Sequence, residues 1–148
     1  MNYLKYIPTL GPIGYLPAPG TCASAVTFIV LYAIRFGHYA VITQWVWAII
    51  LFIGSSLLIS FLLRYFNAAD PSEIVLDELV GSMIAVCGVA PTMVNYCVAF
   101  ILFRLFDIFK PLGIKKLEQL PGGWGVVSDD VAAGCAALIF IQIMALIF

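Results

Sequence analysis

Uncharged, strongly apolar runs alternate with short polar segments along this chain. No charged residue occurs within residues 22–34, 45–63, 79–103 or 131–148. A helix of about 20 apolar residues crosses the hydrocarbon core of a bilayer. Residues 45–63 therefore predict a membrane-spanning helix, and residues 131–148 are just long enough for a second one.

The run at 79–103 contains Gly88 and Pro91, which disfavour one straight helix, so we expect two short helices joined by a tight turn. The predicted fold is all-α, an integral membrane bundle with about four to five membrane-embedded helices in one domain, 1–148. Its first 20 residues, rich in proline and glycine, are expected to be irregular. The predicted helical segments are 22–40, 45–63, 74–103 with its split near Pro91, and 129–148.

Composition supports a membrane location. The 148 residues are 64% hydrophobic and 10% charged, whereas soluble domains are roughly 25% charged. The net charge of -1 and the lack of a basic stripe argue against a nucleic-acid partner. The four cysteines form no CxxC pair and are expected to pack as small hydrophobes. Four prolines in the first 20 residues argue against a removable signal peptide.

Basic residues predict the orientation, because Lys and Arg accumulate on the cytoplasmic side of short loops. A cytoplasmic N-terminus leaves only Arg35, with His38, near the far side. The same topology brings every acid to the cytoplasmic face, which predicts a site there. The six basic residues on the cytoplasmic side are Lys5, Arg64, Arg104, Lys110, Lys115 and Lys116.

All eight acidic residues lie between positions 70 and 130. Five of them fall at three places within apolar sequence, which we call the clusters: the pair Asp77 and Glu78, the single Asp107, and the pair Asp129 and Asp130. Carboxylates beside lipid-facing sequence are costly and invite a functional explanation. Mg²⁺ prefers such oxygen ligands, so the clusters predict a divalent-metal site. Neighbouring helical residues point about 100° apart; we therefore expect one of Asp77 and Glu78 to bind metal and the other to support it or act as a base.

A structural role is the alternative for the last cluster. Ser128 is a good N-cap residue, which would place Asp129 and Asp130 in a first helical turn, where the helix dipole favours negative charge. Similarly, Asp70 before Pro71 is typical of a helix opening, with Glu73 in its first turn.

Groups suited to phosphate accompany the acids. Arg104 and Lys110 flank Asp107 at three residues on either side, so all three share a face if the helix continues; a salt-bridge ladder or membrane anchoring is the alternative. The glycine loop around Gly123 could hold an anion before a helix N-terminus. Thr21, with Ser24 three residues later, is predicted by default to be an N-cap, although this helix end faces the same side as the acids.

Four segments, in order and covering most of the chain, resemble the phosphatidylglycerophosphatase A family. PAPGTCAS is similar to PGTxGS, DPSEIVLDELVG to DPxxIVxDExxG, FRLFDIFKPLGI to FRxFDIxKPxPI, and GGWGVVSDDVAAG to GGxGIMxDDxxAG. Ala23 replaces a usual Gly and Gly113 a common Pro. Neither departure removes a charge or a hydroxyl.

The resemblance implies a Mg²⁺-dependent hydrolase of the bacterial cytoplasmic (inner) membrane that converts phosphatidylglycerol phosphate to phosphatidylglycerol. Water attack and an aspartyl-phosphate intermediate both remain open, as does homo-oligomer formation. A small transporter with an acidic ion or proton relay is the alternative from a different class. The residues implied are Asp107, Asp77 and Asp130 as catalytic; Asp77, Glu78, Asp129 and Asp130 as metal ligands; and Arg104, Lys110, Thr21, Ser24 and Gly123 as substrate contacts.

Overall fold

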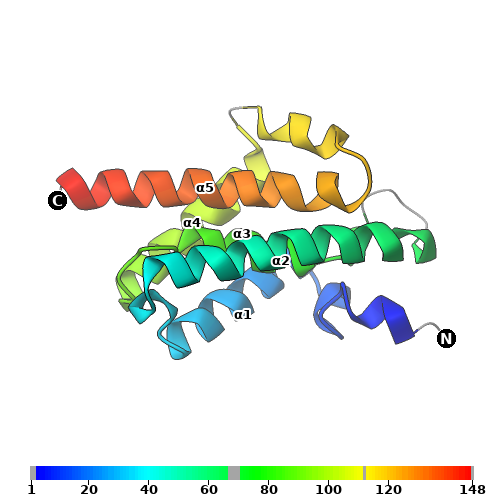
Figure 1. The fold of residues 1–148 in the computed structure, drawn as a ribbon, viewed down its shortest axis with the longest axis horizontal. Helices are drawn as coiled ribbons and strands as arrows, with labels where there is room; N and C mark the ends of the chain where they lie inside the picture. Colours follow the sequence, from blue (N-terminus) through cyan, green and yellow to red (C-terminus); the bar gives the residue numbers. More distant parts are fainter. Residues whose placement is uncertain (1–2, 67–70, 112, 148) are drawn as a thin grey trace.

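The computed structural model describes residues 3–66, 71–111 and 113–147, and within these ranges it contains helices and no strand (Figure 1). The all-α class is therefore confirmed. The α-helices are α1 Pro19–Ala33, α2 Val41–Leu62, α3 Leu76–Ala85, α4 Met93–Phe109 and α5 Gly123–Ile147. Short 3-10 helices are η1 Tyr3–Tyr6, η2 Ile13–Tyr15, η3 Phe36–His38, η4 Leu63–Tyr65 and η5 Ile114–Gln119.

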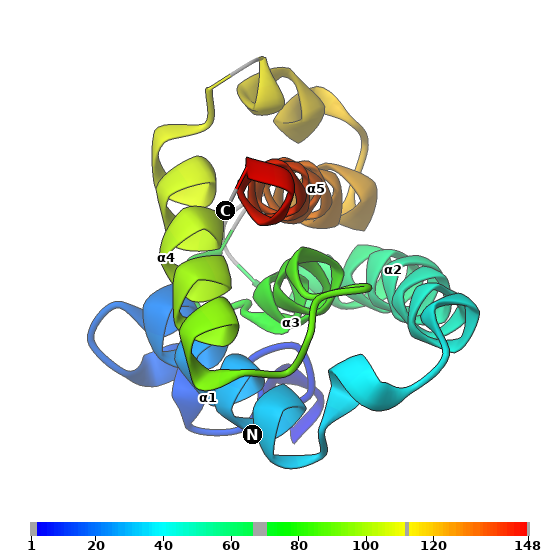
Figure 2. The same cartoon turned by 90° about the vertical axis from the view of Figure 1, so that its left-hand side faces the viewer.

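The short helix α3 lies in the middle of the bundle, with the other four α-helices around it (Figure 2). Its residues from Val80 to Ala85 are buried, as are Val86 and Cys87 directly after it, and Phe103 of α4 and Ile59 of α2 are fully buried in the same core. A helix enclosed on all sides must be apolar around most of its circumference. The two acids at its start are therefore held at one end of the core.

Glycines let α3 and α5 approach closely. A Cβ atom on Gly134 of α5 would lie 2.3 Å from the Gly81 carbonyl oxygen of α3, and one on Gly81 would lie 2.6 Å from the Asp130 carbonyl oxygen. Only residues without a Cβ permit this backbone contact. Asp77 and Asp130 each precede one of these glycines by four residues, so the crossing brings the two acids together.

Two helices in the described part of the chain are long and apolar enough to cross a bilayer: α2 with η4, Val41–Tyr65, and α5, Gly123–Ile147. Helix α1 is a shorter apolar helix, and α3 and α4 contain 10 and 17 residues. The predicted count of four to five membrane-embedded helices is therefore not confirmed. Ile42 and Ile53 of α2 and Ile143 of α5 are exposed, as contact with lipid requires.

Several helix starts differ from the sequence-based expectation. Helix α5 begins at Gly123, six residues before the predicted start, so Ser128 is not an N-cap and Asp129 lies more than one turn inside the helix. The extra turn forms because Gly123 packs against α2, where a Cβ would lie 2.3 Å from the Ser56 carbonyl oxygen. Helix α1 starts at Pro19, so Thr21 lies inside its first turn rather than capping it.

The segment before α3 is not helical. Glu73 precedes the helix, which starts at Leu76, so the prediction of Glu73 in a first helical turn was wrong; Asp70, its predicted cap, lies outside the described residues. The N-terminal segment holds these residues in place before α3: the Val75 N–H donates a hydrogen bond to the Pro8 carbonyl oxygen at 3.0 Å.

Candidate active site

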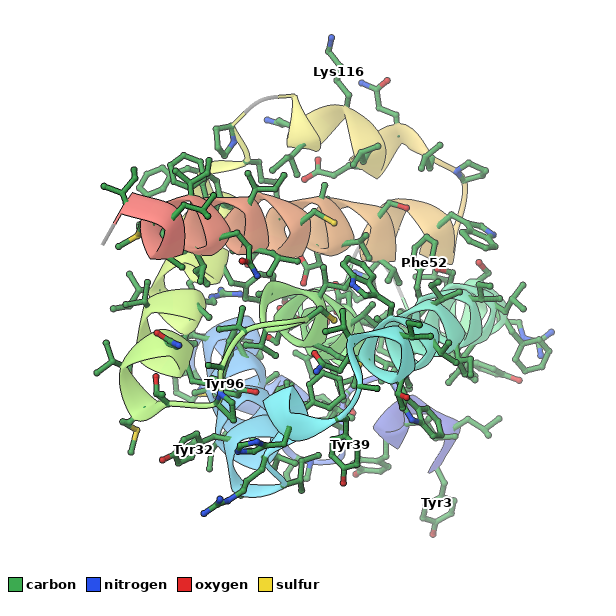
Figure 3. All side chains as sticks on the ribbon, turned by 60° about the vertical axis from the view of Figure 1, so that its left-hand side comes forward. Tyr3, Tyr32, Tyr39, Phe52, Tyr96 and Lys116 are labelled. Carbon is green, nitrogen blue, oxygen red and sulfur yellow. The ribbon has the colours of Figure 1, made fainter. Side chains whose placement is uncertain are left out.

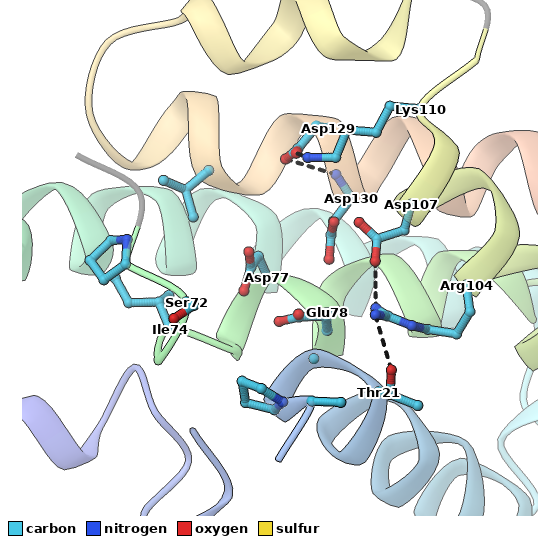
Figure 4. Close-up of a pocket in the computed structure, with 15 residues that line it drawn as sticks. Thr21, Ser72, Ile74, Asp77, Glu78, Arg104, Asp107, Lys110, Asp129 and Asp130 are labelled. Carbon is cyan, nitrogen blue, oxygen red and sulfur yellow. Dashed lines mark hydrogen bonds and ion pairs between the residues drawn. The ribbon is translucent and has the colours of Figure 1, made fainter. Parts of the chain in front are cut away.

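A cavity of about 270 Å³ opens where the N-termini of α1 and α3 meet the end of α4 and the second turn of α5 (Figure 4). It gathers residues from four separate segments of the sequence. Its polar lining residues are Thr21, Ser72, Asp77, Glu78, Arg104, Asp107, Lys110, Asp129 and Asp130.

Three carboxylates form the acidic wall of this cavity, from Asp77 and Glu78 of α3 and Asp130 of α5. Each offers an oxygen, and the three oxygens lie within 4.8 Å of one another. Although Asp77 and Glu78 are adjacent on the helix, both reach this point. Glu78 does so by lying against the α1 backbone, where a Cβ on Gly20 would be 2.1 Å from Glu78 Oε1. The structure thus brings both acids, not one of them, to the candidate metal centre.

The acidic wall has the donor set that a hard cation needs. Asp77 Oδ1, Glu78 Oε2 and Asp130 Oδ2 are buried and accept no hydrogen bond from the described residues. Burial, together with the charges of Glu78 and Asp130, raises the pKa of Asp77 well above its usual value. Burial likewise raises the pKa of Glu78, with a further contribution from Asp107 that Arg104 opposes. A divalent cation would satisfy these oxygens and offset their repulsion, so the residues fit Mg²⁺.

Asp129 does not join these three carboxylates. Its Oδ2 accepts a hydrogen bond from Lys110 Nζ at 2.5 Å, and its Oδ1 accepts one from the Asp130 N–H at 3.0 Å. Because α5 begins at Gly123, neither Asp129 nor Asp130 occupies the first helical turn, and the explanation of these acids as stabilisers of a helix start was wrong.

Arg104 forms the opposite wall and connects α4 to α1. Its guanidinium pairs with Asp107 one turn further along α4, and Nη2 donates to Thr21 Oγ1 at 3.2 Å. Ser24 stands behind this contact: it is fully buried, accepts from Arg104 Nη1 at 3.5 Å and donates to the Gly20 carbonyl oxygen at 2.7 Å. Thr21 thus lines the cavity, whereas Ser24 holds the arginine in place.

Lys110 lies beyond the end of α4, in a left-handed conformation with φ of 44°. It therefore does not continue one helical face with Arg104 and Asp107, as the spacing had suggested. Its ammonium instead bridges Glu118 of η5 at 2.6 Å and Asp129 of α5 at 2.5 Å. Burial opposes the lysine charge, but the hydrogen bonds to Asp129 and Glu118 outweigh it and raise the pKa of Lys110.

Gly123 is not brought to the cavity. Its N–H donates to Ser60 Oγ at 2.8 Å, and its Cα packs on α2. Gly122 and Gly123 serve a close contact with α2, and the Gly123 N–H that was expected to hold an anion is already used.

Sequence reasoning missed several contributors. Gly20 admits Glu78, Ser72 lines the opening, and Glu118 holds Lys110. A signal for the acidic wall was present: Asp77 and Asp130 both begin a D-x-x-x-G pattern, in DELVG and DVAAG. This spacing puts each acid on the helix face of the glycine that makes the α3/α5 contact.

The family described as Phosphatidylglycerophosphatase A matches residues 6–145. The chain belongs to this family. Membership makes it a phosphatase, and both walls of the cavity fall inside the matched range.

Individual relatives agree on a phosphatase but differ in the substrate in their names. A protein of Bacteroides thetaiotaomicron, named provisionally as a phosphatidylinositol-3-phosphatase, is 37% identical over 88% of this chain and 86% of its own length. A phosphatidylglycerophosphatase A of Haemophilus influenzae is 32% identical over 95% of this chain and 93% of its own length. The Escherichia coli phosphatidylglycerophosphatase A is 33% identical over 44% of this chain and 39% of its own length. No solved structure matches the chain.

Proposed function

We propose that this protein removes the terminal phosphate of phosphatidylglycerol phosphate, releasing phosphatidylglycerol and inorganic phosphate for bacterial phospholipid synthesis. The observation that carries the proposal is a single cavity in which three carboxylates face Arg104, each with a buried oxygen that has no hydrogen-bond partner in the described part of the chain. A phosphomonoester bound to a divalent cation is complementary to both walls.

Asp77, Glu78 and Asp130 would hold Mg²⁺. When bound, the ion supplies charge to the phosphoryl oxygens and lowers the pKa of a bound water. Arg104 would bind the phosphate through its planar fork, and for this it must exchange its Asp107 partner for a substrate oxygen. Thr21 keeps the guanidinium aimed into the cavity throughout this exchange. Lys110, tethered by Asp129 and Glu118, adds a point charge at the rim.

Asp107 is the residue on which the two mechanisms differ. As a nucleophile, its carboxylate oxygen would form a bond to phosphorus while the bond to the glycerol oxygen breaks; that oxygen takes a proton, and water then hydrolyses the aspartyl phosphate. As a base, Asp107 would instead take a proton from a water that attacks phosphorus directly. The ion pair with Arg104 holds the carboxylate at the cavity before substrate binds, and the exchange would release it for either role.

We further propose that the protein is a multi-pass protein of the bacterial inner membrane with its cavity on the cytoplasmic face. Helices α2 and α5 would span the bilayer. Arg64 lies in η4, at the end of α2 opposite the turn that carries Arg35 and His38 (Figure 1). The charge bias of the sequence supports a cytoplasmic location for the Arg64 end.

The main competing substrate is phosphatidylinositol 3-phosphate, because a relative with 37% identity carries that activity in its name. Both lipids present a phosphomonoester beside a diacylglycerol phosphodiester. An ion or proton relay receives less support, since α5 carries no charged residue after Asp130 and five of the eight acids line one cavity rather than following a helix.

The test is phosphate release by detergent-purified protein from phosphatidylglycerol phosphate, phosphatidylinositol 3-phosphate and phosphatidic acid, each with Mg²⁺ and with excess chelator. We expect metal-dependent release that is fastest with the first lipid and is lost in Asp130→Asn. A preference for the inositol lipid would replace the proposed substrate. Folded protein that releases nothing from any of the three would reject the proposed enzyme.

A further inference from the structure

A second cavity of about 460 Å³ runs along the outside of α1 and α4. Its floor is aromatic: Phe28 and Tyr96 are 5% and 3% exposed, and the Phe28 ring packs edge-on against Phe100 at 5.6 Å between centroids. Its rims are Ile29 of α1 and Ile101 of α4, which are 66% and 55% exposed. The groove therefore presents a continuous apolar surface and no charged side chain.

This groove begins one helical turn from the active-site cavity, on the same two helices. Thr21 lines the polar cavity and Ala25, one turn later in α1, lines the groove; on α4, Arg104 lines the cavity and Ile101, one turn earlier, lines the groove. Residues three or four apart share a helix face. The hydrogen bond from Arg104 to Thr21 joins the two helices where the polar and apolar parts meet.

We propose that this groove binds an acyl chain of the lipid whose phosphate is held at Arg104. The inference rests on the proposed function, and adds to it the part of the site that distinguishes a membrane lipid from its headgroup alone. A ligand that reaches from the polar cavity into the groove must be charged at the Arg104 end and apolar beyond it. This is the order of groups in a diacyl phospholipid.

The dimensions suit a chain. From Thr21 to Tyr32 the α1 axis extends roughly 16 Å at 1.5 Å per residue, and the volume of the groove is in the range of ligand pockets. Tyr32 and Tyr96 lie side by side toward the part of the groove away from Arg104, with ring centroids 5.7 Å apart (Figure 3). Helix α1 has only 15 residues, so its exposed apolar face lies beside the site without the length needed to span a bilayer.

The test compares dioleoyl with dihexanoyl phosphatidylglycerol phosphate in detergent. Cys97 is an exposed groove residue two turns from Arg104, so Cys97→Phe fills the groove at a distance from the phosphate. Ala25→Phe fills it from α1. Val30→Phe is the matched control, because Val30 is 49% exposed on α1 and lines neither cavity.

We expect each groove variant to lower the ratio of kcat/KM for the dioleoyl lipid to that for the dihexanoyl lipid by about tenfold or more, since one methylene in an apolar pocket is worth at least that much. Val30→Phe should leave this ratio within about twofold, the scale of surface changes. Activity on the dihexanoyl lipid shows that a variant is folded.

Two results overturn the inference. Unchanged ratios in both groove variants, whether activity on the two lipids is kept or falls equally, would remove the groove from lipid binding and leave the proposed function intact, provided that the wild type hydrolyses both lipids. A wild-type dimer that dissociates in Cys97→Phe, again without a change in ratio, would identify a second copy of the chain as the occupant. If the wild type releases no phosphate from either lipid, the proposed function itself fails.

Discussion

The two walls of the candidate active site carry opposite charges and are neutralised differently. On the α3/α5 wall, oxygens of Asp77, Glu78 and Asp130 are buried without a hydrogen-bond partner among the described residues. On the α4 wall, Arg104 is paired with Asp107, and Lys110 with Asp129 and Glu118. Like charges that are buried together repel one another strongly, whereas ion pairs are already compensated.

This difference assigns separate tasks to the walls. Under the proposed function, Mg²⁺ from solution completes the acidic wall, so the stability of this wall should depend on the ion. The cations of the basic wall already have carboxylate partners, so Arg104 would bind phosphate only by exchanging Asp107 for it. Each wall can therefore be disturbed while the other is monitored, through metal-dependent stability for the first and substrate kinetics for the second.

The largest effect is expected for Asp130→Asn, which removes one ligand from the acidic wall. Metal catalysis supplies several kcal/mol of transition-state stabilisation, so kcat/KM should fall by about a thousandfold. Because an ion that binds only the folded state stabilises it, the proposed site predicts that Mg²⁺ raises the unfolding temperature of the wild type and not that of the variant. Phosphate release and thermal unfolding check these two results.

In excess chelator the variant should unfold at the same temperature as the wild type or above it, because a buried carboxylate near two others is lost. A variant that keeps activity within about tenfold, or keeps its Mg²⁺-dependent stabilisation, would show that Asp130 is not a ligand.

On the basic wall, Arg104→Lys keeps the charge beside Asp107 and loses the planar fork that also reaches Thr21. Charge-assisted hydrogen bonds contribute about 1.5–3 kcal/mol each, so we expect kcat/KM to fall by roughly 10- to 100-fold. Stabilisation by Mg²⁺ should stay at the wild-type level, since no acid of the opposite wall changes. Loss of that stabilisation would mean that the two walls are not separable.

Gly134→Ala tests the packing that builds the acidic wall. The new Cβ would lie 2.3 Å from the Gly81 carbonyl oxygen, and backbone at this distance must shift. Overpacking of this kind costs about 1–3 kcal/mol, and it should also weaken Mg²⁺ binding because Asp130 moves with α5. Chemical denaturation and Mg²⁺ titration measure both effects.

The matched control is Gly54→Ala in α2, where a Cβ meets no atom within 4 Å. It should leave Mg²⁺ binding unchanged and keep or raise stability, since Ala favours a helix over Gly by up to about 1 kcal/mol. Equal behaviour of the two alanine variants would contradict the role of the glycine contact.

The sequence was sufficient to predict the all-α class from its long apolar runs, and to point to the acids because carboxylates beside lipid-facing sequence are costly. It also gave the residues of both walls, since Asp77, Asp107 and Asp130 all line one cavity. The candidate residues alone did not show which acids would face one another across the cavity. Asp129 and Asp130 are adjacent and chemically identical, yet only Asp130 faces the other acids.

The start of α5 decides whether Asp129 and Asp130 begin a helix or lie inside one, and it depends on tertiary contact. Ser128 before two acids is a good local signal for a helix start, but Gly123 fits against Ser56 and Ser60 of α2 and extends the helix backward. Lys110 is a second case: its left-handed conformation after α4 turns it toward Glu118 rather than along the Arg104 face. Local patterns do not contain these contacts between distant segments.

The smallest effect is expected for Glu118→Gln, at the outer edge of the basic wall. The Glu118 side chain is 35% exposed in its pair with Lys110, and exposed ion pairs contribute about 0–1 kcal/mol. Lys110 keeps Asp129, whose side chain is only 6% exposed, as its second partner. We therefore expect kcat/KM to change by less than about threefold and the free energy of unfolding by less than about 1 kcal/mol.

The Glu118→Gln variant is to be compared with Lys110→Gln. It removes the charge and leaves the buried Asp129 carboxylate without its ammonium partner, which is costly, so it should raise KM and lower stability more than Glu118→Gln does. Steady-state kinetics and denaturation of both variants test this order. If Glu118→Gln were as damaging as Lys110→Gln, the lysine would depend on η5 for its position, and the basic wall would extend from α4 into that segment.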